Sequence, residues 1–84
     1  MKKIDSIKKK IIYRSEYRGI KEMDLILGSF VKKYVDSFSY EELLDLYNIL
    51  EKDDDTIFKW YSNNENNEEI AKSNVSNLLK NFKL

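Results

Sequence analysis

The fifteen residues IKEMDLILGSFVKKY, numbers 20–34, decide the fold of this chain. Their apolar side chains recur at spacings of three and four, the period of one face of an α-helix: Ile20, Met23, Leu27, Phe30 and Tyr34. We expect this helix to end near Asp36. The chain has no proline and only two glycines, and such a composition favours long helices over a turn-rich β fold.

The residues before this stretch predict another helix, from about Asp5 to Arg18. One stripe along it recurs at helical spacing: Ile4, Ile7, Ile11 and Arg14. Tyr13 and Tyr17 lie beside the stripe. Gly19 follows at the place where a residue in the left-handed conformation closes a helix at little steric cost. The sequence therefore predicts a tight turn between the two helices.

Two further helix starts follow. Ser39 and Glu42 have the spacing of a capping box, in which the Ser39 side chain accepts from the backbone amide of Glu42 and the carboxylate reaches back. The helix after this box places Leu43, Tyr47 and Leu50 on one face and Leu44 and Leu46 on its flanks. The acidic run Asp53–Asp55 with Thr56 predicts a second N-cap, which begins a short helix.

The end of the chain completes an all-α pattern. The polar stretch from Ser62 to Asn67 predicts a loop, and a last helix is expected from about Glu68 to Phe82. Its apolar face repeats at helical spacing: Ile70, Asn74 or Val75, Leu78 and Phe82. The sequence therefore predicts one domain, residues 1–84, folded as a small bundle of about five helices, three of them long.

The composition of the 84 residues excludes several kinds of chemistry. Fifteen Lys and Arg balance fifteen Asp and Glu, and His and Cys are absent. Without Cys the chain has no disulfide, no thiolate nucleophile and no Cys-ligated metal. Without His it lacks the most common general acid–base group and the most common transition-metal ligand. We therefore expect neither an enzyme nor a metal-binding protein.

The chain shows no apolar run of the ~20 residues that a membrane span needs. Its start, MKKIDSIKKKII, lacks the apolar core and the cleavage site of a signal peptide. The sequence is also rich in Ile, Lys and Asn, which suits an AT-rich bacterial genome. We therefore expect a protein of the bacterial cytoplasm that does not insert into membranes.

The zero net charge is unevenly distributed. Residues 1–21 carry eight basic and two acidic side chains, whereas residues 22–84 carry seven and thirteen. The basic residues between 2 and 14 leave a small regulatory module, either nucleic-acid-binding or antitoxin-like, as the alternative function. A dedicated nucleic-acid binder usually keeps a net basic charge. We therefore expect a solvated helix face, or a surface that steers an acidic partner, and no nucleic acid.

Two local features allow a more specific interpretation. A calcium loop starting at Asp53 would need a glycine at its sixth place, where Phe58 stands, so a helix cap explains the acidic run better. The aromatic residues Phe58, Trp60 and Tyr61 share one short helix and are expected mostly to pack in the core, although not all three can face inward. An exposed Trp60 would be a natural anchor for a partner protein.

The junction Arg18-Gly19-Ile20-Lys21-Glu22-Met23-Asp24 is the most informative stretch for function. Since Ile20 and Met23 serve the core, Arg18, Glu22 and Asp24 are expected to project elsewhere, around a glycine that exposes backbone. Each charged residue also has a local explanation, because acids favour a helix start and an Arg can cap a helix end. Together they predict a partner-binding surface, formed by Arg18, Gly19, Glu22 and Asp24.

At this junction the pattern R-G-x-x-E-x-D resembles the signature of the SdhE/YgfY proteins, bacterial relatives of the mitochondrial succinate dehydrogenase assembly factor. The resemblance continues through LILGSF (residues 25–30), Tyr34, the Ser39 cap, the stretch Leu50–Asp54, Phe58 and Trp60, and covers about residues 11–61. Tyr17 stands where many members carry a second Arg. Asp55-Thr56 replaces a frequent Pro-Asp.

The resemblance implies an assembly factor, or chaperone, that is not itself a catalyst. Its client would be the flavoprotein subunit of succinate dehydrogenase, or that of fumarate reductase. It would promote covalent attachment of FAD to a histidine of the client, with Arg18, Gly19 and Glu22 docking near the client's flavin site. The chain itself is expected to bind no cofactor, since it has no glycine-rich loop to hold phosphates.

Overall fold

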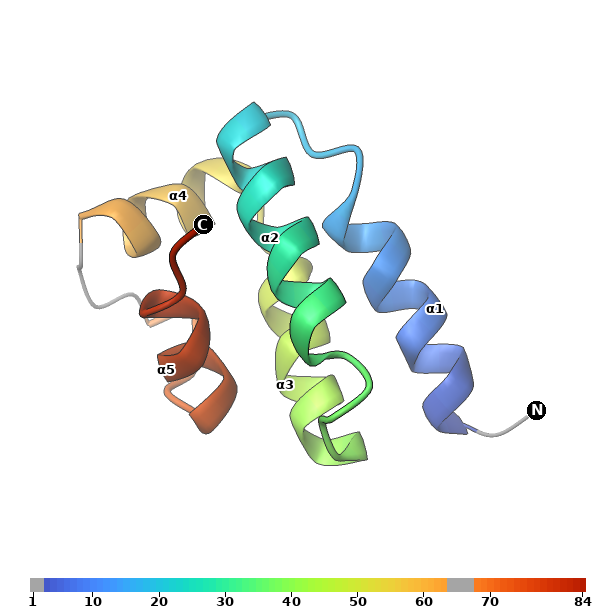
Figure 1. Ribbon diagram of the computed structural model, residues 1–84. Coiled ribbons are helices and arrows are strands. Elements are labelled where there is room, and N and C mark those ends of the chain that lie inside the picture. Colours follow the sequence, from blue (N-terminus) through green and yellow to red (C-terminus); the bar gives the residue numbers. More distant parts are fainter. Residues whose placement is uncertain (1–2, 64–67) are drawn as a thin grey trace.

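Five α-helices make up the part of the chain that this computed structural model describes, residues 3–63 and 68–84 (Figure 1). They are α1 (Lys3–Ser15), α2 (Lys21–Tyr34), α3 (Tyr40–Leu50), α4 (Asp54–Ser62) and α5 (Asn74–Lys80). No strand occurs within these residues. The predicted all-α bundle of five helices, three long and two short, is confirmed.

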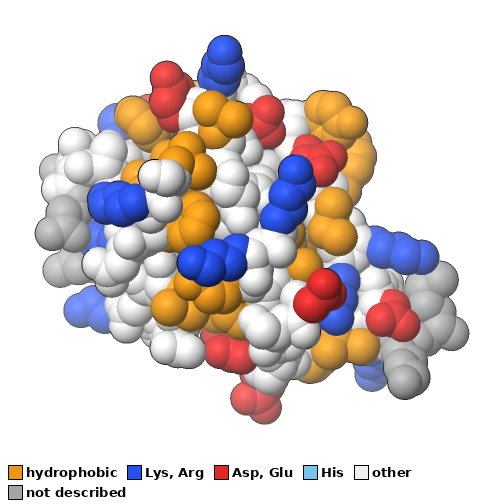
Figure 2. Space-filling view, in the orientation of Figure 1, with side chains coloured by type: hydrophobic (Ala, Val, Ile, Leu, Met, Phe, Trp, Pro, Cys, Tyr) orange, Lys and Arg blue, Asp and Glu red, His pale blue; other side chains and the backbone are white. Residues whose placement is uncertain are grey.

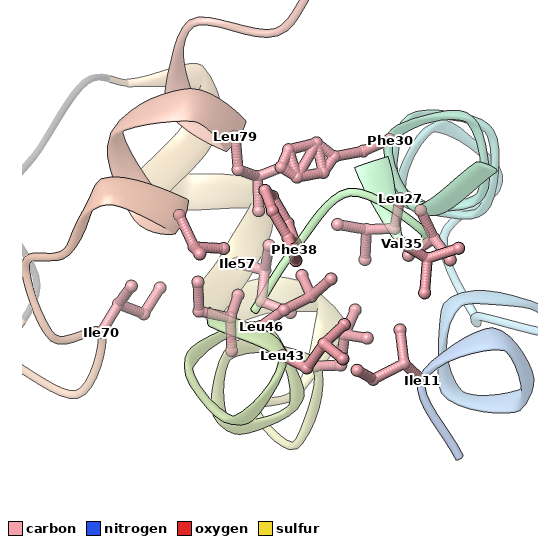
Figure 3. Close-up of a cluster of buried hydrophobic side chains, with 14 of the residues drawn as sticks. Ile11, Leu27, Phe30, Val35, Phe38, Leu43, Leu46, Ile57, Ile70 and Leu79 are labelled. Carbon is pink, nitrogen blue, oxygen red and sulfur yellow. The ribbon is translucent and has the colours of Figure 1, made fainter. Parts of the chain in front are cut away.

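The core lies between α1, α2 and α3 and is closed by α4 and α5. α1 packs against both α2 and α3, and α5 packs against α3. Figure 3 shows side chains from all five helices converging, with Ile11 pointing toward Leu43 and Leu79 lying beside Phe30. The predicted face of α2 is confirmed, because Met23, Leu27 and Phe30 are fully or almost fully buried.

The first helix is shorter than predicted, and the residue that closes it is a different one. α1 ends at Ser15 rather than at Arg18. The left-handed residue is Tyr17, with φ of 58°, and Gly19 has no positive φ. The reason is that the Arg18 side chain turns back and donates to the carbonyl oxygen of Arg14 at 2.9 Å, which holds the chain in a turn before Gly19 is reached.

Both predicted N-caps are confirmed. The Glu42 amide donates to Ser39 Oγ at 3.2 Å, and the Ser39 amide donates to Glu42 Oε1 at 2.9 Å. The Thr56 amide donates to Asp53 Oδ1 at 2.9 Å and so fixes the start of α4. On α3, however, Leu46 is buried in the core rather than on a flank.

The last helix begins later than predicted. α5 starts at Asn74 rather than at Glu68, because Ser73 is its N-cap and exchanges side-chain hydrogen bonds with Ser76. Ile70 is nevertheless buried, although it precedes the helix. The loop predicted from Ser62 to Asn67 falls largely on residues 64–67, which lie outside the described residues. None of the described helices has the length and apolar content required to span a bilayer.

The capping box of α3 makes stability sensitive to acid. The hydrogen bond from the Ser39 backbone amide, with a second bond from Asn74, holds the pKa of Glu42 below its ordinary value. Because this pKa is lowered on folding, its contribution to stability is complete above about pH 4.3, the ordinary pKa of Glu. The contribution is lost as the pH falls through the lower pKa of the folded state.

We expect Glu42→Gln to weaken this acid sensitivity, because Gln keeps an acceptor for the Ser39 amide but does not titrate. Urea unfolding followed by circular dichroism at neutral pH and at about pH 3 measures the effect. The wild-type protein should lose more unfolding free energy on acidification than the variant does. Equal losses in the two proteins would show that the box does not sense pH.

Candidate functional site

The turn between α1 and α2 is held by the side chain of Arg18, which points into the protein and is only 9% exposed. Arg18 Nε donates to Asp54 Oδ1 at 2.6 Å. Nη1 donates to the carbonyl oxygens of Arg14 and Leu50, and Nη2 to that of Lys52, each at 2.9 Å. All three nitrogens of the guanidinium group are therefore occupied within the chain.

Asp54 completes this arrangement from the other side. Its side chain is 14% exposed, and its second oxygen, Oδ2, accepts from the backbone amide of Ile20 at 2.9 Å. One carboxylate at the start of α4 thus holds both the Arg18 side chain and the backbone at the start of α2. We call Arg18 and Asp54, together with their hydrogen bonds to each other and to the backbone, the turn clamp.

The turn clamp corrects the prediction for Arg18. The sequence pattern suggested that Arg18 projects from the surface with Glu22 and Asp24, and this is wrong. Its guanidinium is enclosed because a carboxylate and three carbonyl groups surround it, and burying such a charge without partners would be costly. Arg18 shapes the turn from inside the protein, whereas its neighbours Gly19 and Glu22 are exposed.

Gly19 is exposed and lies directly over the turn clamp. A Cβ atom at this position would lie 3.4 Å from Asp54 Oδ2, which is an ordinary van der Waals contact. Since Gly19 also lacks a positive φ, neither space nor backbone conformation within the chain demands a glycine. The groove beside it is lined by residues that include Tyr17, Arg18 and Lys52. The bare backbone of Gly19 is thus accessible from outside.

Glu22 and Asp24 do not form one cluster. They are two residues apart on α2, so they lie on different sides of the helix. Glu22 is exposed, and no hydrogen bond or ion pair of its carboxylate is found within residues 3–63 and 68–84. Asp24 is half-buried and lines a second groove together with Tyr17 and Leu25. The structure therefore keeps Gly19 and Glu22 on the surface and places Arg18 inside.

Trp60 is part of the core rather than an exposed anchor. Its side chain is 5% exposed, and Lys80 Nζ lies 5.1 Å from the centre of its ring. Phe58 and Tyr61 are half-buried against the core. The expectation that these aromatic residues mostly pack in the core is confirmed, whereas the possible partner contact of an exposed Trp60 is wrong. The residues that lie beside Trp60 include Ile70, Ala71 and Lys80.

Among the described Asp and Glu residues, no group of three could hold a metal ion. The hydrogen bonds from Thr56 hold the pKa of Asp53 below its ordinary value, so Asp53 stays ionised as a helix cap. What the site offers to the surroundings is the exposed backbone of Gly19 and the exposed carboxylate of Glu22, next to a turn that the turn clamp holds.

Sequence comparison identifies the family of this chain. A family model described as "Flavinator of succinate dehydrogenase" matches residues 9–83. This chain belongs to that family. The match reaches well beyond residues 11–61, so the tail after Ser62, which carries no recognisable motif, is also part of the family pattern. The resemblance noted in the sequence is confirmed.

Three curated relatives illustrate the similarity. The chain is 39% identical over 61 residues, 73% of its length and 43% of the relative, to "Succinate dehydrogenase assembly factor 2, mitochondrial" of Debaryomyces hansenii. It is 32% identical over 65 residues, 77% of its length and 35% of the relative, to the protein of that name in Arabidopsis thaliana. It is 36% identical over 53 residues, 63% of its length and 49% of the relative, to "FAD assembly factor SdhE" of Acetobacter pasteurianus.

In each of these alignments the chain spans less than half of the relative's length. No solved structure matches the chain. Family membership therefore rests on the sequence comparison, and the geometry of the site comes from this structure alone.

Proposed function

We propose that this protein is an assembly factor that binds the flavoprotein subunit of succinate dehydrogenase and promotes covalent attachment of FAD to it. The observation that carries the proposal is the family match over residues 9–83. The relatives' names agree with it, since one is a FAD assembly factor and others are succinate dehydrogenase assembly factors. The flavoprotein subunit of fumarate reductase is proposed as a second client.

Gly19 and Glu22 form the proposed docking face for the client. Both are exposed, the fold itself does not require the glycine, and the carboxylate is available to a donor of the client. Asp24 lies on another side of α2, and we propose that it adds a separate contact from its own groove. Arg18 acts as a positioning residue, because its bonds to Asp54 and to three carbonyl groups fix the turn that presents Gly19.

The proposed mechanism is positioning rather than acid–base catalysis. The chain contains no His, so the histidine that becomes bonded to FAD belongs to the client, and the cofactor stays with the client. A rigid docking face can hold the client in the conformation in which its histidine and its flavin lie in reacting geometry. Binding that conformation more tightly than others raises its population. The protein is therefore proposed to be neither an enzyme nor a flavin carrier.

Coexpression with the client tests this function directly. We expect the flavoprotein subunit produced together with this protein to carry several times more covalent flavin than the subunit produced alone. The measurement is flavin fluorescence of the denatured subunit on a gel, where only covalently bound flavin remains. Equal covalent flavin in the two preparations would contradict the proposal.

The alternative function, a nucleic-acid-binding or antitoxin-like regulator, is not favoured. On the face seen in Figure 2, basic, acidic and hydrophobic side chains are interleaved rather than gathered by charge. Two of the basic residues are also paired with acids, Lys8 with Asp36 at 3.4 Å and Arg14 with Glu51 at 3.6 Å. Such pairs lower the positive charge offered to phosphates.

The proposed place of action is the compartment in which the flavoprotein subunit receives FAD, which in a bacterium is the cytoplasm. The relatives from Debaryomyces and Arabidopsis are named as mitochondrial, whereas the one from Acetobacter carries no such term in its name. The sequence composition favours the bacterial setting.

A further inference from the structure

We infer that Tyr13 and Tyr17 form a second contact surface for the client flavoprotein, entering an apolar pocket of that protein whose rim is acidic on the side that meets Lys9 and Lys10. We call these two residues the tyrosine ridge. The inference rests on the proposed function, because it names the same client. It adds a recognition element outside the docking face of Gly19 and Glu22.

The backbone at Tyr17 is the first reason. Its φ of 58° lies in the left-handed region, which is unfavourable for a residue with a bulky side chain and is normally taken by Gly or Asn. The turn clamp holds the chain in this conformation by fixing Arg18, the next residue. Strain of this kind persists where the surrounding structure imposes it, and it is concentrated at functional positions.

The exposure of the ridge is the second reason. Tyr17 is 83% exposed and Tyr13 is 70% exposed, one helical turn earlier. The two ring centres are 6.3 Å apart with the planes tilted by 51°, so the rings contact each other rather than the core. Large aromatic side chains held outward on a rigid turn are the residue type that most often dominates a protein interface.

The position of the ridge connects it to the docking face. Tyr13, Tyr17 and Gly19 line the same groove, so a partner seated on Gly19 reaches both rings. On its other side Tyr17 borders the groove of Asp24, together with the exposed Leu25. The ridge therefore lies between the two surfaces that carry the residues of the docking face.

Charge indicates the chemistry of the partner's pocket. Tyr13 borders a groove lined by Lys9, Lys10, Arg14 and Tyr47. The other groove, which Tyr13 shares with Tyr17, contains the acids Glu16 and Glu51, so the excess of basic charge lies only on the Lys9 and Lys10 side of the ridge. A partner that receives the rings in an apolar pocket meets these basic side chains at the edge, and acidic groups there would be complementary. A predominantly basic edge on the client would instead repel this end of α1.

Tyr17→Gly separates recognition from folding. Glycine adopts the left-handed conformation without strain, so we expect a melting temperature equal to that of the wild-type protein or a few degrees higher. Affinity for the purified flavoprotein subunit, measured by isothermal titration calorimetry, should fall by at least about tenfold.

Tyr13→Ala should weaken binding in the same way. Tyr40→Ala, at an exposed tyrosine of α3, is the matched control and should bind as the wild-type protein does.

The outcomes distinguish the inference from the proposed function. If the wild-type protein binds the subunit and raises its covalent flavin, but Tyr17→Gly and Tyr13→Ala bind equally well, the ridge is not a contact and the proposed function stands. If the wild-type protein neither binds the subunit nor raises its covalent flavin, both proposals are wrong. Weaker binding by Tyr17→Gly with undiminished thermal stability supports the ridge, because a merely structural tyrosine would not give that combination.

Discussion

Asp54→Ala is expected to lower the free energy of unfolding by about 3 kcal/mol, because it leaves the guanidinium of Arg18 enclosed without its carboxylate. The Asp54 side chain is 14% exposed and accepts from both Arg18 Nε and the Ile20 amide. Its removal therefore leaves two donors unsatisfied. A small domain is stable by only about 5–15 kcal/mol, so the loss should be visible as a large shift of the urea midpoint.

Asp55→Ala is the matched control for this variant. Asp55 is the next residue of the same acidic run, and it pairs with Lys59 at 3.2 Å with both side chains largely exposed. An exposed pair of this spacing contributes about 0.3–0.5 kcal/mol. Similar midpoints for the two variants would show that the turn clamp does not stabilise the fold as described.

Glu22→Ala is expected to lower the gain in covalent flavin by at least about tenfold while leaving the melting temperature nearly unchanged. The carboxylate is exposed, and its position in the first turn of α2 contributes about 0.3–1 kcal/mol to stability. Losing one charged contact at the centre of an interface costs more, about 2–5 kcal/mol. The measurement is the fluorescence of covalent flavin on the denatured subunit after coexpression.

Glu41→Ala controls for the general effect of removing an acid from a helix start. Glu41 is exposed in the first turn of α3, as Glu22 is in the first turn of α2. The control should leave the covalent flavin unchanged. If both variants lower it equally, Glu22 has no special part in docking; if neither lowers it, the docking face lies elsewhere.

The helix faces and N-caps, which are set by residues close together in the sequence, could be predicted well. The spacing of Met23, Leu27 and Phe30 identified the buried face of α2, and the Ser39 box and the Asp53 cap are formed as expected. Caps and periodicity are set by residues within one or two turns of each other, so the sequence alone contains the information.

The predictions that failed concern contacts between residues far apart in the sequence. Arg18 and Asp54 are 36 positions apart, and no local pattern indicates that one encloses the other. α1 ends at Ser15, before this pair, and Tyr17 rather than Gly19 takes the left-handed conformation. The sequence left open which aromatic residue of α4 faces outward, because the residues beside Trp60, among them Ile70 and Lys80, come from a later part of the chain.

The turn clamp also offsets the partial charges at the ends of several helices. Arg18 binds carbonyl oxygens in the last turn of α1 and at the last residue of α3, whereas Asp54 stands at the start of α4 and accepts from the residue that caps α2. A helix carries partial negative charge at its carboxyl end and partial positive charge at its amino end. One ion pair therefore neutralises the ends of four helix dipoles at one point. The two charges cannot be exchanged, since a cation at residue 54 and an anion at residue 18 would each meet dipole ends of their own sign.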